Sequence, residues 1–305
     1  MSVPAAGTSK KSLFSQQDHL APLAIPTGES AVDMVNVIWR KCDVYLDIGS
    51  YSISSGMLIL WPMIMLFIFL AFVMNDTDIV LYGTCILAIP ILMLIHSLFQ
   101  PTPLPIRFNR QRREVCVPRE NGNYWIVPWE TVTAATSEHS TVSQVGTHSM
   151  GMLFISFDNP DPHAEESNKH VFWGFNCGSS EGAMAQWECM RSYMEIGPHV
   201  VKDNSARFHY PKGILATYVD NLFIAAKRKG WFMTLVWEGF CGIFIFNTFL
   251  IDALERLKLY PLPDFPCPDI IEWSKPLPPE QWAKRSPELE LAIAAREAEL
   301  AARSL

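Results

Sequence analysis

The sequence predicts a membrane protein of the α+β class, with an N-terminal two-helix transmembrane hairpin, a small antiparallel β-sheet domain capped by a helix, an apolar helix and a helical tail. Three observations predict it. Two apolar runs without Lys or Arg lie close together between residues 57 and 99. Short runs that alternate apolar and polar residues follow them. A third apolar block, near residue 240, precedes a proline-rich and charged end.

Residues 57–74 and 79–99 are predicted to form the hairpin. These runs of about 18 and 21 residues are long enough to cross a hydrocarbon core of roughly 30 Å, because a helix rises about 1.5 Å per residue. Pro62 and Pro90 fit this prediction, since prolines are commoner in transmembrane helices than in soluble ones. The short turn between the runs forces the two helices to lie antiparallel.

Basic residues near the ends of the hairpin predict its orientation. The turn carries Asp76 and Asp78 but no Lys or Arg, whereas Arg40 and Lys41 precede the hairpin. The positive-inside rule therefore places both flanks in the cytoplasm. Five arginines follow the hairpin and are candidate contacts for anionic lipid or a partner, or serve only to set topology and solubilise a strand turn. They are Arg107, Arg110, Arg112, Arg113 and Arg119.

The segment after the hairpin has the period of β-strands, with Asn121-Gly122 as a tight-turn signal. A polar stretch at 137–149 separates the earlier strands from the later ones, and a helix capped by Ser179 or Ser180 is predicted at 181–196. Strands are predicted at 106–108, 115–117, 124–134, 151–158 and 170–177.

These patterns divide the chain into five consecutive segments. They are an N-terminal cytoplasmic segment at 1–47, the transmembrane hairpin at 48–100, the β-rich domain at 101–200, an amphipathic and third apolar helical region at 201–259, and a proline-rich linker with a charged C-terminal helix at 260–305.

Two resemblances follow from these motifs. The strand pair around FNRQRREV at 108–115 and the Trp129-Glu130 step resemble the pleckstrin-homology-like (PH-like) domains that bacterial membrane proteins carry beside transmembrane hairpins. More narrowly, the segments at 103–117, 127–130 and 191–198 resemble an uncharacterised bacterial membrane-protein family that is often encoded beside type VI secretion effectors. This second resemblance covers residues 58–198, with a weaker echo in the tail.

The narrower resemblance implies a setting and a role. It implies a multi-pass protein of the bacterial inner membrane whose main soluble domain is cytoplasmic. We expect an immunity or accessory protein for a type VI secretion toxin, acting by binding, with membrane lipids and a toxin or secretion component as partners. The alternative is a membrane-tethered PH-like module that binds lipid or protein and has no toxin role.

The third apolar block, residues 231–250, leaves two interpretations open. It is long enough to span a membrane but contains Glu238 and Asn247, and a carboxylate at the bilayer centre costs about 2.5–3.5 kcal/mol on insertion scales. The block is therefore either a third crossing or an interfacial or protein-buried helix. Glu238 is accordingly a candidate buried polar residue in an apolar helix, or a residue facing solvent or headgroups. Directly before the block stands a basic triplet of Lys227, Arg228 and Lys229. It either marks a cytoplasmic entry into the membrane, or its side chains snorkel to the headgroups from an interfacial helix.

The composition and motifs indicate binding and not catalysis. The net charge of −7 argues against a nucleic-acid partner, because nucleic-acid-binding domains are usually basic. The seven cysteines are scattered and are predicted to be isolated reduced thiols. The histidines lack HxxxH and HExxH spacing, and no phosphate-binding or nucleophile-elbow motif occurs. We therefore expect no enzyme, no metal and no cofactor.

Overall fold

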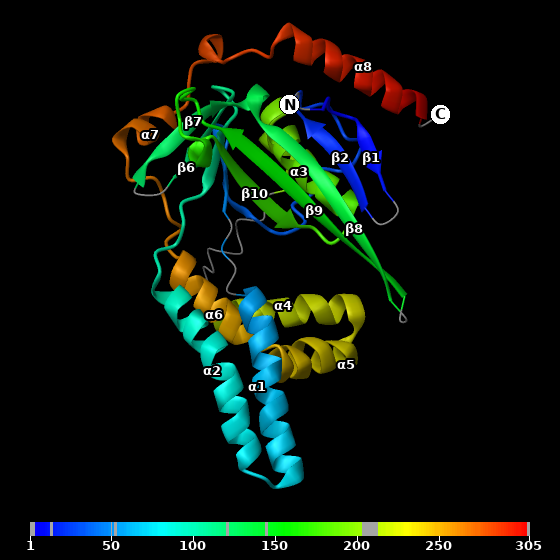
Figure 1. Cartoon of the computed structure of the whole chain (residues 1–305), viewed down its shortest axis with the longest axis vertical. Helices are drawn as coiled ribbons and strands as arrows, with labels where there is room; N and C mark the ends of the chain where they lie inside the picture. Colours follow the sequence, from blue (N-terminus) through cyan, green and yellow to red (C-terminus); the bar gives the residue numbers. More distant parts are fainter. Residues whose placement is uncertain are drawn as a thin grey trace. The chain divides into compact units, whose positions relative to one another are not determined.

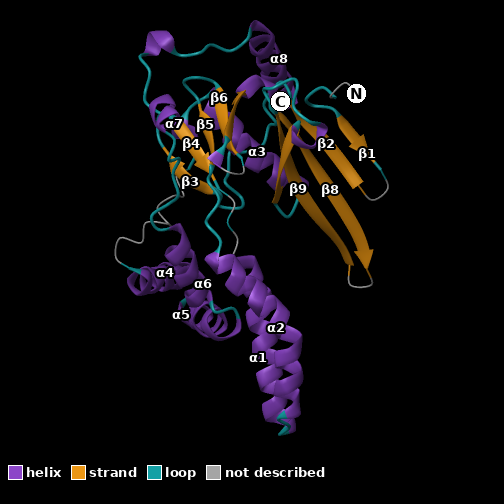
Figure 2. Ribbon diagram, turned by 60° about the vertical axis from the view of Figure 1, so that its left-hand side comes forward, coloured by secondary structure: helices purple, strands orange, loops and turns teal. Residues whose placement is uncertain are grey.

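The computed structural model describes residues 4–12, 15–49, 51, 54–119, 122–143, 146–202 and 213–303. The fold is α+β, and the chain forms two compact units (Figures 1 and 2). The β-unit comprises Met1–Gly49, Leu104–Ser205 and Asp264–Leu305; the helical unit comprises Ser50–Pro103 and Ala206–Pro263. Each unit is therefore assembled from separate stretches of sequence, unlike the five consecutive segments drawn from the sequence.

Two five-stranded antiparallel sheets build the β-unit. Sheet A has the order β1-β2-β8-β9-β10 and sheet B the order β3-β4-β5-β6-β7. The strands of sheet A are β1 (Ser9–Lys11), β2 (Ser15–Ala21), β8 (Thr133–Ser143), β9 (Gly146–Asp158) and β10 (His170–Asn176). The strands of sheet B are β3 (Ile38–Lys41), β4 (Tyr45–Ile48), β5 (Ile106–Asn109), β6 (Glu114–Pro118) and β7 (Tyr124–Pro128).

The strands confirm part of the sequence-based prediction and correct part of it. The β5–β6 hairpin and strands β9 and β10 lie where the alternation predicted them. The prediction that residues 137–149 separate the strands is wrong. The described residues of this stretch belong to β8 and β9, which form one long hairpin. The predicted run at 124–134 is broken at η2 (Trp129–Thr131), where the chain passes from sheet B to sheet A. The turn residues 120–121 lie outside the described part of the chain.

The N-terminal residues are part of the folded β-unit. They supply the first two strands of each sheet: Ser15 pairs with His139, and Ile48 pairs with Ile106 across the position where the helical hairpin is inserted. The sequence placed these residues in a separate segment because β2, SQQDHLA, lacks a clear apolar face of its own.

A single hydrophobic core joins the sheets to α3 (Ser180–Glu195). The predicted cap is confirmed, since the Ser179 hydroxyl accepts a hydrogen bond from the Gly182 N–H at 3.0 Å. The helix is buried on nearly all sides, because β8 and β9 cover one side and the segment at 27–35 contacts others. Trp187 of α3 stacks on Trp129 at 5.4 Å between ring centroids, which adds roughly 0.5–1.5 kcal/mol beyond area burial. The sequence predicted a helix that covers the sheet. In the structure, α3 is a buried central helix of the β-unit.

The helical unit begins with α1 (Ser54–Met74) and α2 (Asp78–Phe99), which form the predicted antiparallel pair. Both are long and apolar enough to cross a membrane, with mean hydropathies of 2.7 and 2.3, and only 11% of each apolar window is buried inside the protein. Gly83 lets the helices approach closely, because a Cβ there would lie 2.6 Å from the Phe67 ring. The two helices are confirmed, and they suggest that the protein associates with a membrane.

The third apolar block does not form one straight helix. After α4 (Ile214–Lys229) come α5 (Trp231–Thr234), the π-helix η6 (Leu235–Ile245) and α6 (Thr248–Leu259). The axis bends by 64° between Trp231–Ile245 and Thr248–Leu259. The bend falls at Asn247, whose φ of 48° is left-handed and whose side chain accepts a hydrogen bond from the Leu250 N–H.

The C-terminal residues return to the β-unit. The predicted charged C-terminal helix is confirmed as α8 (Pro287–Arg303), with an ion pair between Glu299 and Arg303. The proline-rich stretch before it is not wholly extended, because α7 (Pro268–Trp273) starts with a proline in its first turn, where proline is tolerated. Ile270 and Trp273 of α7 pack with Cys116 of sheet B.

Candidate functional site

The five predicted arginines lie on or beside β5 and β6, but they do not form one exposed basic patch. Arg107 and Arg113 are buried, and Arg110, Arg112 and Arg119 are half-buried. Each of the five contacts other residues of the β-unit. Arg107 and Arg113 each belong to a network of ion pairs.

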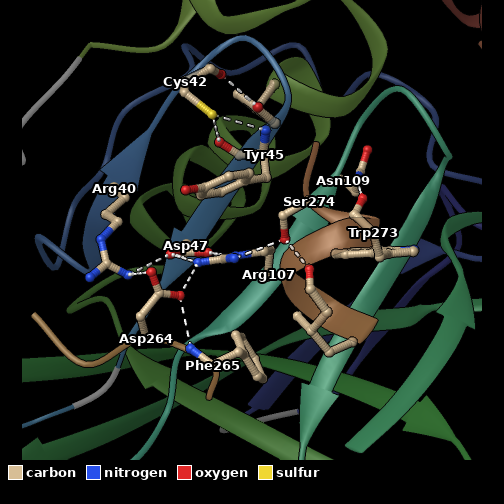
Figure 3. Close-up of polar contacts among 12 residues, drawn as sticks. Arg40, Cys42, Tyr45, Asp47, Arg107, Asn109, Asp264, Phe265, Trp273 and Ser274 are labelled. Atoms are coloured by element: carbon tan, nitrogen blue, oxygen red, sulfur yellow. Dashed lines mark hydrogen bonds and ion pairs between the residues drawn. The ribbon is translucent and has the colours of Figure 1, made fainter. Parts of the chain in front are cut away.

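The first network is centred on Arg107 and Asp47 (Figure 3). The Arg107 guanidinium donates to both carboxylate oxygens of Asp47, with Nε–Oδ1 at 2.6 Å and Nη2–Oδ2 at 2.7 Å. It also donates to Asp264 at 2.8 Å and to the Ser274 hydroxyl at 2.9 Å. The Tyr45 ring lies 3.9 Å from the guanidinium carbon. A bidentate arginine–carboxylate pair of this kind fixes geometry as well as charge.

Strand register explains why these residues meet. Asp47 on β4 is paired with Arg107 on β5, and Arg40 on β3 is paired with Asp47. Cross-strand partners point to the same face of a sheet, so the three side chains form one row. The row continues to Cys116 on β6, which is paired with Arg107. The C-terminal segment then adds Asp264 over this row, so the two arginines are balanced by two carboxylates.

Burial and charge act in opposite directions on Arg107. Burial alone would lower the pKa of the guanidinium, but the hydrogen bonds and charge of Asp47 outweigh it and raise that pKa. Burial also raises the pKa of the neighbouring Cys116 thiol to about 12, so this thiol is neutral at pH 7. Burial likewise raises the pKa of the Asp47 carboxyl, although its hydrogen bonds with Arg107 act to lower that pKa.

The second network joins three of the sequence motifs around Glu195, the last residue of α3. Its carboxylate accepts hydrogen bonds from Arg113 at 2.8 and 3.1 Å, from the Trp129 indole at 2.7 Å and from Arg285 at 2.6 Å. Arg113 also pairs with Glu130 at 3.0 Å. Arg113, Trp129 with Glu130, and Glu195 come from the segments at 103–117, 127–130 and 191–198, respectively, so the fold brings the three motifs into contact.

The remaining arginines contact neighbouring parts of the β-unit. Arg110 lies over the Trp282 ring, and Arg119 lies over the Trp125 ring. The Arg112 guanidinium donates to the Trp273 carbonyl at 2.9 Å. The charges of Arg107 and Arg113 are paired with carboxylates inside the β-unit. A lipid or partner contact of the five arginines stays a prediction.

A surface that the sequence did not single out lies on sheet A. Leu153, Ile155 and Phe157 of β9 face the core, so the alternate residues point to the opposite face. Figure 1 shows α3 on one side of sheet A and, among the described elements of the β-unit, none over β8, β9 and β10 on the other side. A groove of about 710 Å³ opens on this face and is mostly apolar.

Two phenylalanines dominate this groove, which we call the sheet A groove. Phe154 of β9 is 38% exposed and Phe172 of β10 is 69% exposed. Small partners lie beside them, because Phe154 is paired with Ala135 and Gly174, and Phe172 with Ser156. Exposed apolar patches of this kind commonly mark interaction sites. The run HVFWGFN could have indicated this groove from the sequence, because it places aromatic residues on both faces of the strand.

Glu238 lies on η6 in the helical unit. It is half-buried and its Oε1 pairs with the Lys229 ammonium at 2.8 Å, while its backbone carbonyl accepts a hydrogen bond from the Tyr218 hydroxyl at 2.6 Å. Its Oε2 atom is buried and has no hydrogen-bond partner among the described residues. The ion pair of its side chain is therefore with α4.

Within the described ranges, no group of three or more His, Cys, Asp or Glu residues is placed to hold a metal ion. Burial raises the pKa of Cys177 to about 11 and also raises that of Cys189, as it does for Cys116. The arrangement as a whole can bind and position other groups through charge and apolar surface. The absence of catalysis stays a prediction.

One comparison with known proteins gives a match. The model of a protein family described as a "Family of unknown function (DUF6708)" matches residues 84–252, which is more than half of the 305 residues. No curated protein and no solved structure matches the chain significantly.

Proposed function

The chain belongs to the DUF6708 family, and we propose that it is a membrane-anchored binding protein that serves as an immunity or accessory protein for a type VI secretion toxin. The observation that carries the binding role is the sheet A groove, an apolar surface in a unit whose buried charges are paired with one another. The link to type VI secretion rests on the resemblance of the segments at 103–117, 127–130 and 191–198.

The proposed location is the bacterial inner membrane, with α1 and α2 as a hairpin and the β-unit in the cytoplasm. The lengths and hydropathies of the two helices support insertion. The acidic turn between them and the basic residues on both flanks support the orientation. Insertion of a hairpin also explains how β4 and β5 remain paired although more than 50 residues separate them.

The β-unit supports a PH-like description in its order of elements. Strands β4–β7 form an antiparallel meander, β8–β10 form a second one, and α3 follows directly. This order of strands followed by one packed helix is the feature that the sequence shared with PH-like domains. In this chain the two sheets are extended by β1, β2 and β3 from the N-terminal residues.

The partner surface is the sheet A groove, and the partner is the toxin or a secretion component with a complementary apolar segment. Aromatic residues in a shallow apolar surface are typical anchors of protein interfaces. Neutralising a toxin requires occupying its surface and needs no bond-making step. Binding alone therefore suffices for the proposed role.

A rescue experiment tests the proposal. Cells that express the toxin encoded beside the gene should survive when the full chain is co-expressed, and Phe154→Asp with Phe172→Asp should abolish survival. Met34→Asp is the matched control, because Met34 is an exposed apolar residue of the β-unit that does not line the groove. Correct membrane fractionation of every variant is checked by blotting. Death of cells with wild-type protein in the membrane would refute the toxin role, and survival with the double variant would refute the surface.

The alternative, a PH-like module that binds anionic lipid through the arginines, is supported only by the partial exposure of Arg110, Arg112 and Arg119. Replacing Arg110, Arg112 and Arg113 with Gln should then abolish binding of the purified chain to anionic vesicles. The internal contacts of Arg113 with Glu195 and Glu130 make this alternative the weaker one.

A further inference from the structure

A second groove lies in the helical unit, and Glu238 is one of its lining residues. It has a volume of about 630 Å³, within the usual range of ligand pockets. Most of its lining is apolar and comes from α1, η6 and the bend after it, with Leu58, Trp237 and Phe246 among the lining residues. We call it the membrane groove.

One end of the membrane groove is charged. Lys229, the last residue of α4, lines the groove and pairs with Glu238, and the adjacent Lys227 and Arg228 are exposed. Lys229 therefore places one ammonium group at the groove, and Lys227 and Arg228 precede it at exposed positions in the last turn of α4. Glu238 also presents the buried Oε2 atom that lacks a hydrogen-bond donor among the described residues. A ligand that suits this groove combines an apolar chain, a negative charge and a hydroxyl donor.

The position of the groove along α1 bears on which molecules can reach it. The Trp61 indole donates to the Phe244 carbonyl at 3.0 Å, and Met57 packs with Ile251, so η6 and α6 contact the first two turns of α1. Trp61 lies about 10 Å along the axis from the start of α1, given a rise of about 1.5 Å per residue. If α1 enters the bilayer at its first turn, this contact lies near the boundary between headgroups and acyl chains.

The direction, length and exposed residues of the helices around the groove bear on how they would meet a membrane. Figures 1 and 2 both show α4 and α5 running across the direction of α1 and α2. Helix α5 and η6 together hold 15 residues, and at about 1.5 Å per residue they fall short of a hydrocarbon core of roughly 30 Å. Trp231, Phe232 and Trp237 are more than half exposed, and tryptophan is enriched at the membrane interface.

We infer that α4, α5 and η6 form an in-plane membrane element whose groove binds one anionic phospholipid. The phosphate pairs with the basic triplet of Lys227, Arg228 and Lys229, an acyl chain occupies the apolar groove, and a headgroup hydroxyl donates to Glu238 Oε2. This inference rests on the membrane anchoring in the proposed function and is independent of the toxin role. It also moves the lipid contact away from the arginines on β5 and β6.

The test uses the full chain reconstituted in phosphatidylcholine vesicles that contain nitroxide-labelled phosphatidylglycerol or nitroxide-labelled phosphatidylcholine. The fraction of motionally restricted label, measured by electron paramagnetic resonance, gives the relative association of each lipid. We expect phosphatidylglycerol to be favoured at least about fivefold, because each basic residue near an anionic lipid contributes roughly that factor. The triple variant Lys227→Gln, Arg228→Gln and Lys229→Gln should reduce the preference to about one.

Two controls keep the result interpretable. Removing the three exposed charges of Lys10, Lys11 and Lys275 in the β-unit should leave the preference unchanged. The conservative variant Lys227→Arg with Lys229→Arg should retain it, which shows that charge and not folding is measured. A wild-type chain without preference, or a triple variant with the full preference, would overturn the inference. Absence of any restricted lipid would instead show that the chain is not inserted and would count against the proposed anchoring.

Discussion

Arg107 shows how the surroundings of a side chain decide what its charge can do. An exposed arginine beside a membrane exit is free to meet anionic headgroups, but Arg107 is only 3% exposed and lies directly opposite Asp47. Moving such ions out of water costs several kcal/mol each, so the pair persists because its hydrogen-bonding atoms find partners. Removing one partner should therefore be much more damaging than removing a surface charge.

We expect Arg107→Gln to lower the free energy of unfolding by about 3–5 kcal/mol, because it leaves the Asp47 carboxylate buried beside only Arg40. Arg119→Gln is the matched control and should cost about 1 kcal/mol, because Arg119 is half-buried and donates to a neutral amide, that of Asn168. Denaturant unfolding of the detergent-solubilised chain, followed by tryptophan fluorescence, measures both. Equal losses from the two substitutions would contradict the structural role of Arg107.

Glu130 gives a pH dependence to the attachment of the C-terminal segment. Burial acts to raise its pKa, but hydrogen bonds from Ser286 and the charge of Arg113 outweigh it and hold the pKa below its ordinary value of 4.5. A carboxyl group whose pKa is lower in the folded state stabilises the fold above its unfolded pKa. That contribution is lost as the pH falls through the folded pKa.

Hydrogen exchange at the Ser286 amide should therefore be slow at pH 6. As the pH falls below about 4.5, its rate relative to the intrinsic exchange rate at the same pH should rise. Glu130→Gln keeps an oxygen acceptor for that amide but cannot titrate, so this variant should lack the excess acceleration. Mass spectrometry of peptides that contain Ser286 reads the rates. An equal response in the variant would assign the effect to another carboxylate.

At the scale of elements, the sequence predicted correctly those elements that a long local run of apolar residues marks. Helices α1 and α2 are runs of about 20 apolar residues, and such runs need no partner to be recognised. Strand β2 has no such signal, because its residues are mostly polar and its partner β8 lies more than 100 residues later in the chain. Tertiary pairing, which the local pattern does not carry, makes it a strand.

The same limit applied to the sites. Arg107 was found as part of a basic run, but its partners Asp47 and Asp264 lie 60 and 157 residues away, so the sequence could not show that Arg107 is paired with carboxylates. Phe172 was placed on a strand correctly, yet alternation could not say which face of β10 would remain uncovered. The basic triplet before Trp231 left a membrane crossing and an interfacial helix open as alternatives, and no local pattern indicated the bend at Asn247.

The bend leads to a prediction about the path of α5, η6 and α6. If these helices return to the side from which α4 enters, residues 227 and 257 face the same compartment; a straight third crossing would place them on opposite sides. We expect Lys227→Cys and Leu257→Cys, each made in a chain without Cys42, Cys85, Cys241 and Cys267, to react with an impermeant maleimide from the same side. Labelling from opposite sides would establish a third span.

At the scale of the whole molecule, the helical unit consists of two insertions into the β-unit. The first leaves sheet B after β4 and returns at β5, and the flanking residues Ile48 and Ile106 are direct partners. The second lies between Val201 and Asp264. The Val201 carbonyl accepts a hydrogen bond from Lys41 at 2.6 Å, and Asp264 pairs with the neighbouring Arg40 at 3.5 Å. Both insertions therefore start and end at points that the β-unit itself brings together.

This arrangement predicts that the β-unit folds alone. Residues 50–103 can be replaced by a turn of about four residues, and residues 206–263 by a glycine–serine linker of about 20 residues, whose mean reach is roughly 25 Å. We expect this shortened chain to be soluble without detergent and to unfold in one cooperative step, because the core that joins both sheets and α3 contains no residue of the helical unit. Adding Glu195→Ala should abolish that cooperativity, since it leaves Arg113 buried without its main partner. If the shortened chain is soluble only in detergent, the two units depend on each other for folding, and the β-unit cannot be treated as a separate binding domain.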